Sequence, residues 1–189
     1  MSASEVLQRI TAALDKSGIA YMLTGSFASA HHGVLRSTQD IDIVISASAA
    51  QLRALRSLLP STEYYLDLDA ALGAHRRESM FNVIDLLTGW KIDFIFRKSR
   101  PFSLEEFGRR QMVDLQGLPL FVASAEDVVI AKLEWTKLAQ SQRQIEDVAT
   151  ILRLRWESLD RAYLEKWVSE LNLARKWSEA KAIAGISEE

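Results

Sequence analysis

Apolar residues recur along the chain with two different periods, which predicts an α/β first part followed by helices. A three- and four-residue spacing predicts amphipathic helices at 2–16 and 49–59. Alternating or continuous apolar runs predict strands at 19–24, 40–45, 64–68, 81–87, 91–96 and 118–122. A polar connection is expected over 69–79, and a further helix begins at residue 103.

In the last third of the chain the spacing of apolar residues becomes that of helices. Ser124 and Asp127 predict a capped helix start, and residues 137–184 contain neither proline nor glycine. We expect the tryptophans of this part to pack its helices together; they are Trp135, Trp156, Trp167 and Trp177. The predicted class is therefore α/β (α+β). It comprises a mixed-sheet core over 1–122 and a helical C-terminal part over 123–189, packed on the core.

Two acids interrupt the apolar strand predicted at 40–45. Successive side chains of a strand point to opposite faces, so Asp40 and Asp42 share one face and Ile41 and Ile43 the other. The apolar face can pack into a core while the acidic face presents two carboxylates side by side. Hard oxygen ligands of this kind suit Mg²⁺. The strand thus predicts a divalent-metal site.

A Gly-Ser pair precedes this strand. Gly25 allows a tight turn, and Ser26 is a natural N-cap for a short helix over 27–32. The N–H groups at a helix start favour phosphate. The Gly-Ser helix start and the acidic strand together predict a phosphate-binding site that faces a pair of metal-binding carboxylates.

The pattern Gly25-Ser26 followed by Asp40-x-Asp42 resembles the nucleotidyltransferase superfamily of the DNA polymerase β type. The longer pattern Gly-Ser-x-Ala…His-Gly-x-x-Arg-x-Thr-x-Asp-Ile-Asp is similar to the bacterial minimal branch near the AbiEii toxins. The resemblance implies transfer of a nucleoside monophosphate from an NTP to an acceptor hydroxyl, with Mg²⁺ or Mn²⁺ as cofactor. The toxin branch favours RNA or protein over a small molecule as acceptor, and implies a cognate antitoxin.

The superfamily carries a third carboxylate on a neighbouring strand, and two acids of the predicted hairpin compete for that role. Asp93 lies in a Lys-Ile-Asp-Phe phrase similar to the family's version, and an exposed edge acid is the alternative. We predict Asp93 as the third ligand, with Asp85 close by on the same sheet face. Hydrophobic sorting favours a three-residue loop that pairs Asp85 with Asp93 over a two-residue loop that buries Asp85.

Basic residues complete the predicted nucleotide site. Arg36 could reach a phosphate or brace Asp40, and a plain loop arginine is the alternative. Family members resembling AbiEii have a lysine near the triphosphate, here Lys132, followed by Arg143 and Asp147. On one continuous helix these three residues would form a single stripe. The other interpretation of Lys132 is a lysine snorkelling from a half-buried helix face.

Composition narrows the class of protein only slightly. The net charge of −2 creates no global basic field, and the absence of cysteine excludes disulfides and thiolate metal sites. Adjacent histidines His31 and His32 diverge on a helix and do not predict zinc. Without an apolar span or a signal-peptide pattern we expect no membrane contact and a cytoplasmic location.

The rival hypothesis is the same fold acting as a catalytically silent binding or partner-interaction module. The intact acidic set argues against it, because unpaired clustered carboxylates reduce stability unless they have a use.

Overall fold

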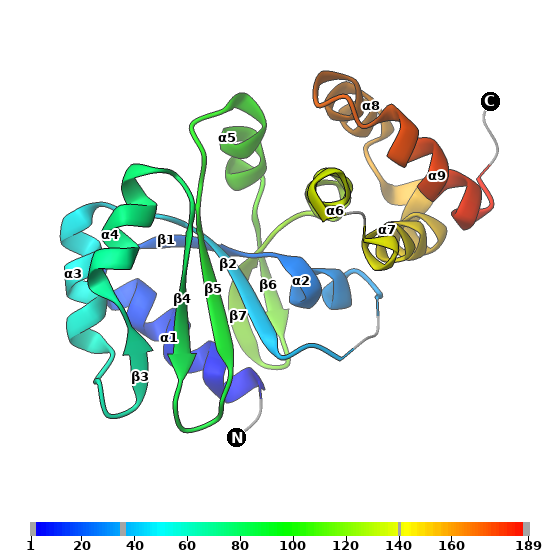
Figure 1. Ribbon diagram of the computed structural model, residues 1–189. Helices are drawn as coiled ribbons and strands as arrows, with labels where there is room; N and C mark the ends of the chain where they lie inside the picture. Colours follow the sequence, from blue (N-terminus) through cyan, green and yellow to red (C-terminus); the bar gives the residue numbers. More distant parts are fainter. Residues whose placement is uncertain (1–2, 35–36, 140, 187–189) are drawn as a thin grey trace. The chain divides into compact units, whose positions relative to one another are not determined.

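A computed structural model describes residues 3–34, 37–139 and 141–186, which form two compact units (Figure 1). The sheet unit comprises 3–27 and 37–123, and the helical unit comprises 28–34, 124–139 and 141–186. The segment 28–34, which the sequence assigned to the α/β core, thus groups with the helices. Helix α2 (Gly25–His31) begins in the sheet unit and continues into the helical unit.

One mixed seven-stranded sheet, in the order β3-β4-β5-β2-β1-β7-β6, forms the centre of the sheet unit. β1 pairs antiparallel with β2 and parallel with β7, and β2 pairs parallel with β5. The α/β mixed-sheet prediction is confirmed. The strands are β1 (Ala20–Leu23), β2 (Asp40–Ser46), β3 (Tyr64–Leu66), β4 (Met80–Asp85), β5 (Lys91–Phe96), β6 (Gln111–Leu115) and β7 (Leu118–Val122).

Most of the buried residues of β2 and β5 lie on one face of the sheet, while Met22 and Val44 are buried on the other. Alternate residues of β2 and β5 point to the first face, and Ile41, Ile43 and Phe94 are fully buried there. Helices α1, α3 and α4 contact one another in succession, and α4 packs on β4. The helices of the unit are α1 (Ala3–Lys16), α3 (Ala49–Leu58), α4 (Leu68–Arg76) and α5 (Pro101–Gly108). Helices α1, α3 and α4 cover the isoleucine face of the sheet. Side chains alternate along β2, so Asp40 and Asp42 lie on the opposite face.

Two elements of the sheet unit differ from the prediction. The polar connection expected over 69–79 is largely helix α4, because Asp67 caps it by accepting a 3.0 Å hydrogen bond from Ala70 N. β6 was not predicted, since Gln111–Leu115 alternates weakly. Its pairing with β7 depends on a turn whose residues Gln116 and Gly117 have φ of 57° and 84°.

The helical unit contains α6 (Ala125–Ala139), α7 (Gln142–Arg155), α8 (Arg161–Glu170) and α9 (Ala174–Ala184), with a 3₁₀ turn at Trp156–Ser158. The predicted cap of α6 is confirmed: Ser124 Oγ accepts from Asp127 N at 3.2 Å. Asp127 is fully buried and accepts a 2.5 Å hydrogen bond from the hydroxyl of Tyr163, which ties α8 to α6. Across the described residues, no helix combines the length and apolarity that crossing a membrane requires.

Two expectations for the helical unit are wrong. The run after residue 124 is not one helix, since α6 ends at Ala139 and α7 starts after Ser141, whose backbone is extended. Serine favours helix starts over helix interiors because its side chain competes for backbone hydrogen bonds. Among the tryptophans, Trp167 and Trp177 are buried as expected, whereas Trp135 is 48% exposed.

Candidate active site

Three of the predicted acids lie together on the face of the sheet opposite α1, α3 and α4. β2 and β5 run parallel in a register that places Asp40 beside Lys91 and Asp42 beside Asp93. Alternation along each strand then puts all four side chains on one face. Asp40 is exposed, Asp42 is half-buried and Asp93 is buried. The register therefore gathers three carboxylates and one ammonium on two adjacent strands.

Gly25 lies directly against Asp42. Its φ is +60°, and a Cβ added there would lie 2.0 Å from Asp42 Oδ2 and 2.6 Å from Asp42 Cγ. The preceding residue, Thr24, donates from its backbone N–H to Asp42 O at 2.9 Å. Glycine is thus required at this position both for backbone conformation and for space. Gly25 and Ser26 begin α2 beside the acidic strand, so Ser26 lies in the first turn of the helix and is not the N-cap that the sequence predicted.

Asp93 is held by two neighbouring side chains. Lys91 Nζ donates to Asp93 Oδ2 at 2.8 Å, and Asn82 Nδ2 donates to Asp93 Oδ1. The hydrogen bond to Asp93 raises the pKa of Lys91, and the charges of Asp93, Asp40 and Asp42 raise it further, against the lowering effect of burial. Lys91 is therefore cationic throughout the neutral pH range. Sequence reasoning gave Asn82 no role, because its contact depends on the hairpin register.

The predicted position of Asp85 is wrong. Ile84 pairs with Lys91 and Asn82 with Asp93, which leaves a four-residue loop over 86–89 and matches neither register considered from the sequence. Asp85 consequently lies on the helix-covered face and is fully buried.

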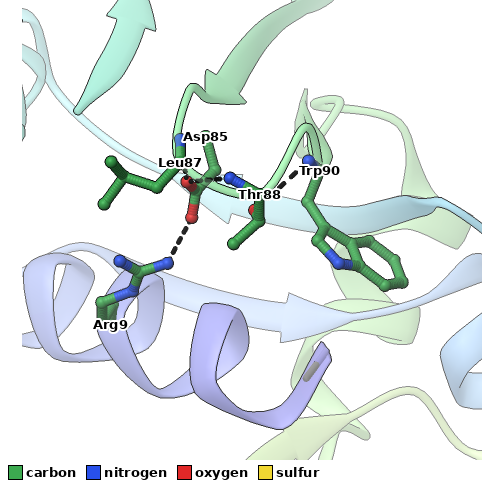
Figure 2. Close-up of polar contacts among 5 residues, drawn as sticks. All are labelled: Arg9, Asp85, Leu87, Thr88 and Trp90. Carbon is green, nitrogen blue, oxygen red and sulfur yellow. Dashed lines mark hydrogen bonds and ion pairs between the residues drawn. The ribbon is translucent and has the colours of Figure 1, made fainter. Parts of the chain in front are cut away.

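Local contacts explain why the loop is longer (Figure 2). The Asp85 carboxylate pairs with Arg9 of α1 and accepts hydrogen bonds from Leu87 N at 3.0 Å and Thr88 N at 3.2 Å. A buried carboxylate needs such partners, and Arg9 supplies the charge. Asp85 therefore organises the turn and has no place among the candidate metal ligands.

The donor chemistry of the acidic face fits a divalent metal ion. Carboxylate oxygens are hard ligands, and the glycine at 25 leaves room for the Asp42 carboxylate. Within the described residues, however, no three Asp, Glu, His or Cys side chains converge closely enough to hold an ion as they stand. The contacts of Asp93 with Lys91 and Asn82 turn its oxygens to those partners.

Further predictions from the sequence concern the loop before β2 and the two adjacent histidines. Arg36 lies outside the described residues. Thr38 supports the start of β2, because its Oγ1 donates to Asp40 O at 3.2 Å and accepts from Asp40 N at 3.3 Å. In the helical unit, His32 bonds through Nδ1 to Arg155 at 2.9 Å. Burial and, secondarily, Arg155 lower the pKa of His31.

Lys132 lies in the helical unit and is buried. Its Nζ donates to Asp147 Oδ2 at 2.7 Å and to Gln144 Oε1 at 2.8 Å, joining α6 to α7. The predicted single stripe is wrong, because the helix break places Lys132 and Asp147 on two facing helices; Arg143 is exposed. A lysine whose side chain is only 5% exposed does not snorkel.

Several solved structures share this fold. The antibiotic-resistance factor ANT(2″)-Ia matches in a solution structure with a TM-score of 0.57 and 14% identity, over 95% of this chain and 97% of that one. Its crystal structure with adenylyl-2″-tobramycin matches with the same TM-score and 15% identity, over 93% and 97% of the two chains. An antigenic nucleotidyltransferase-like protein from Paracoccidioides brasiliensis gives 0.51 and 16%, over 100% and 96%.

No curated protein matches the sequence. A family of proteins described as "Nucleotidyltransferase of unknown function (DUF6036)" does match, over residues 2–184. The match covers the sheet unit and nearly all of the helical unit. This chain therefore belongs to that nucleotidyltransferase family.

Proposed function

We propose that the protein transfers a nucleoside monophosphate from an NTP to an acceptor hydroxyl, and that Asp40, Asp42 and Asp93 hold the required Mg²⁺ or Mn²⁺. The observation that supports it is the β2–β5 register, which brings these carboxylates to one face of the sheet. Gly25, packed against Asp42, adds the second motif of the family to the same place.

Each residue has a distinct part in the proposal. The three carboxylates neutralise and position the ions, which when bound would supply charge stabilisation for the attacking and leaving oxygens. Gly25 and Ser26 offer close backbone approach to the phosphates. The acceptor hydroxyl gives its proton to solvent water, and its oxygen forms a bond to the α-phosphorus as the bond from that phosphorus to the bridging oxygen breaks and pyrophosphate leaves. Little covalent chemistry remains for the protein, so positioning carries the rate.

We retain Arg36 and Lys132 as proposed phosphate contacts. For Lys132 the proposal now has a condition, since its ammonium is paired with Asp147 and bonded to Gln144. A lysine held in this way can contact a triphosphate by exchanging its bond to Asp147 for one to a phosphate oxygen.

The acceptor is proposed from the motif resemblance to the toxin branch. It favours RNA or protein over a small molecule, with a cognate antitoxin as partner and a cytoplasmic, toxin-like role. The structural match to ANT(2″)-Ia, at 14–15% identity, indicates a shared fold. An aminoglycoside-like acceptor is therefore the comparison arm of the experiment.

Incubation with Mg²⁺ or Mn²⁺, each α-labelled NTP, and in turn total RNA, protein extract and aminoglycoside tests the proposal. Label should move to one acceptor class, and Asp40→Asn or Asp42→Asn should reduce transfer by roughly a hundredfold or more. Asp69→Asn, at an exposed acid in the first turn of α4, is the matched control and should retain activity. Relieving repulsion in the two site variants should leave the fold intact.

Full transfer by either site variant would contradict the catalytic roles of Asp40 and Asp42. Tight NTP binding without transfer to any acceptor class would instead support the silent binding module.

A further inference from the structure

The side chain of Asp93 is held by two contacts, one from a short side chain on the neighbouring strand and one from a long side chain on its own strand. Asn82 is short, and its amide comes from the directly paired position on β4. Lys91 reaches Asp93 from two residues along the same strand, and its side chain is 43% exposed while that of Asp93 is 9% exposed. The lysine therefore meets a mostly buried carboxylate from the solvent side.

Lys91 contributes positive charge to this face. Cross-strand pairing sets Asp40 beside Lys91 and Asp42 beside Asp93, which gives three negative charges to one positive in the two pairs. Clustered carboxylates repel one another unless a cation compensates them. Lys91 supplies that compensation with its 2.8 Å contact to Asp93.

We propose that Lys91 is an exchangeable counter-cation of the acidic face, which competes with the divalent metal ion for Asp93, while Asn82 keeps the Asp93 carboxylate oriented. This inference rests on the proposed function, because it assumes that Asp93 is a metal ligand. Metal binding then moves the Lys91 ammonium away from Asp93. The released ammonium remains on the acidic face, where it is available to the anionic phosphates of the nucleotide.

The physical basis is repulsion and flexibility. An ammonium and a divalent ion cannot both approach Asp93 Oδ2 without strong repulsion. The lysine side chain has four methylenes and is partly exposed, so it can leave with small loss of packing. The short side chain of Asn82 projects from the β4 position paired with Asp93, so its amide remains within reach of Asp93 Oδ1 when the lysine moves.

Calorimetric titration with Mn²⁺ alone, without nucleotide, tests this inference. Lys91→Met should bind Mn²⁺ roughly five- to tenfold more tightly than the native protein, the factor expected for losing a positive charge about 7 Å from a divalent ion even in water. Its melting temperature without metal should fall, and saturating Mn²⁺ should raise it by more than in the native protein. Lys91→Gln removes the charge but keeps a hydrogen-bond donor, and should show the same tightening if Lys91→Met folds poorly.

Lys98→Met is the matched control, because it removes the same charge from an exposed lysine beyond the end of β5. It should leave the Mn²⁺ affinity unchanged. Equal affinity in the native protein and both Lys91 variants, or weaker binding in the variants, would overturn the exchange. Equal tightening in Lys98→Met would also overturn it, as an effect of net charge. If the native protein shows no Mn²⁺ binding that Asp42→Asn weakens, the metal site fails, and with it the proposed function.

Discussion

Replacing Gly25 by alanine should reveal how closely the Asp42 carboxylate lies against the start of α2. The backbone of Gly25 has φ +60°, and an added Cβ would lie 2.0 Å from Asp42 Oδ2. The left-handed conformation costs an alanine about 1–2 kcal/mol. Displacing the carboxylate adds the roughly 1–3 kcal/mol that is usual for overpacking. We therefore expect Gly25→Ala to lower the free energy of unfolding by about 2–5 kcal/mol.

Two further variants separate these contributions. Gly89 also has a positive φ, +77°, but an added Cβ would meet no atom within 4 Å. Gly89→Ala should therefore show the backbone cost alone, about 1–2 kcal/mol. Asp42→Ala removes the atoms at 2.0 and 2.6 Å and leaves Asp42 Cβ, at 2.9 Å. In that background Gly25→Ala should cost roughly 1–2 kcal/mol less than in the native protein.

Equilibrium unfolding in urea of the native protein, the single variants and the double variants measures these differences. The dependence of free energy on urea should keep the same slope, which shows that the unfolded states are comparable. Gly89→Ala should be additive with Asp42→Ala, whereas Gly25→Ala should not. If Gly25→Ala costs no more than Gly89→Ala and is additive with Asp42→Ala, the close contact between Gly25 and Asp42 is refuted.

Three other predictions concern ionisable side chains. Arg9→Met should lower the free energy of unfolding by about 3 kcal/mol in urea, because the buried Asp85 loses its guanidinium; a loss below about 1 kcal/mol would contradict this. Lys132→Met should lower the free energy of unfolding by a similar amount, and adding Asp147→Leu should largely restore it. In calorimetry, that double variant should bind NTP more weakly than the native protein. Unchanged affinity would leave Lys132 a purely structural role. Because the pKa of His31 is lowered in the folded protein, the unfolded chain binds more protons below about pH 6.5, so stability should fall as the pH drops through that range. His31→Asn should make the melting temperature depend less steeply on pH, and an unchanged pH dependence would contradict this prediction.

The acidic face was accessible to sequence reasoning because it depends on local alternation. Once Asp40 and Asp42 lie in a strand, their common face follows, and the apolar phrase around Asp93 identifies a second strand of the same kind. The structure places these side chains on one face, as those patterns indicate. Their catalytic roles remain predictions.

The hairpin register was inaccessible for a physical reason. Hydrophobic sorting assumed that both acids face solvent, yet Asp85 is stabilised on the buried face by Arg9, which lies 76 positions earlier in the chain. No local pattern reveals a partner at that distance. The wrong register also hid one contact of the candidate site, because the observed register is what brings Asn82 to Asp93.

The helix break has a similar cause. Serine only weakly disfavours helix interiors, and the break at Ser141 allows Lys132 and Asp147 to meet across two helices. Lysine and aspartate at those positions suggested a common stripe. Their actual pairing is tertiary.

The strand order has a consequence for how the protein is made. The five strands from β3 to β1 in the sheet order all precede residue 97 in the sequence. The second neighbour of β1 is β7, which comes later in the chain and pairs through Val122 with Leu23. As the chain leaves the ribosome, β1 stays an open sheet edge until residues 118–122 emerge, roughly one to five seconds later at about 5–20 residues per second. An open edge can pair with other nascent chains. A slow codon or an insertion between β5 and β7 would lengthen that interval, and should lower the yield of native protein without altering its final stability.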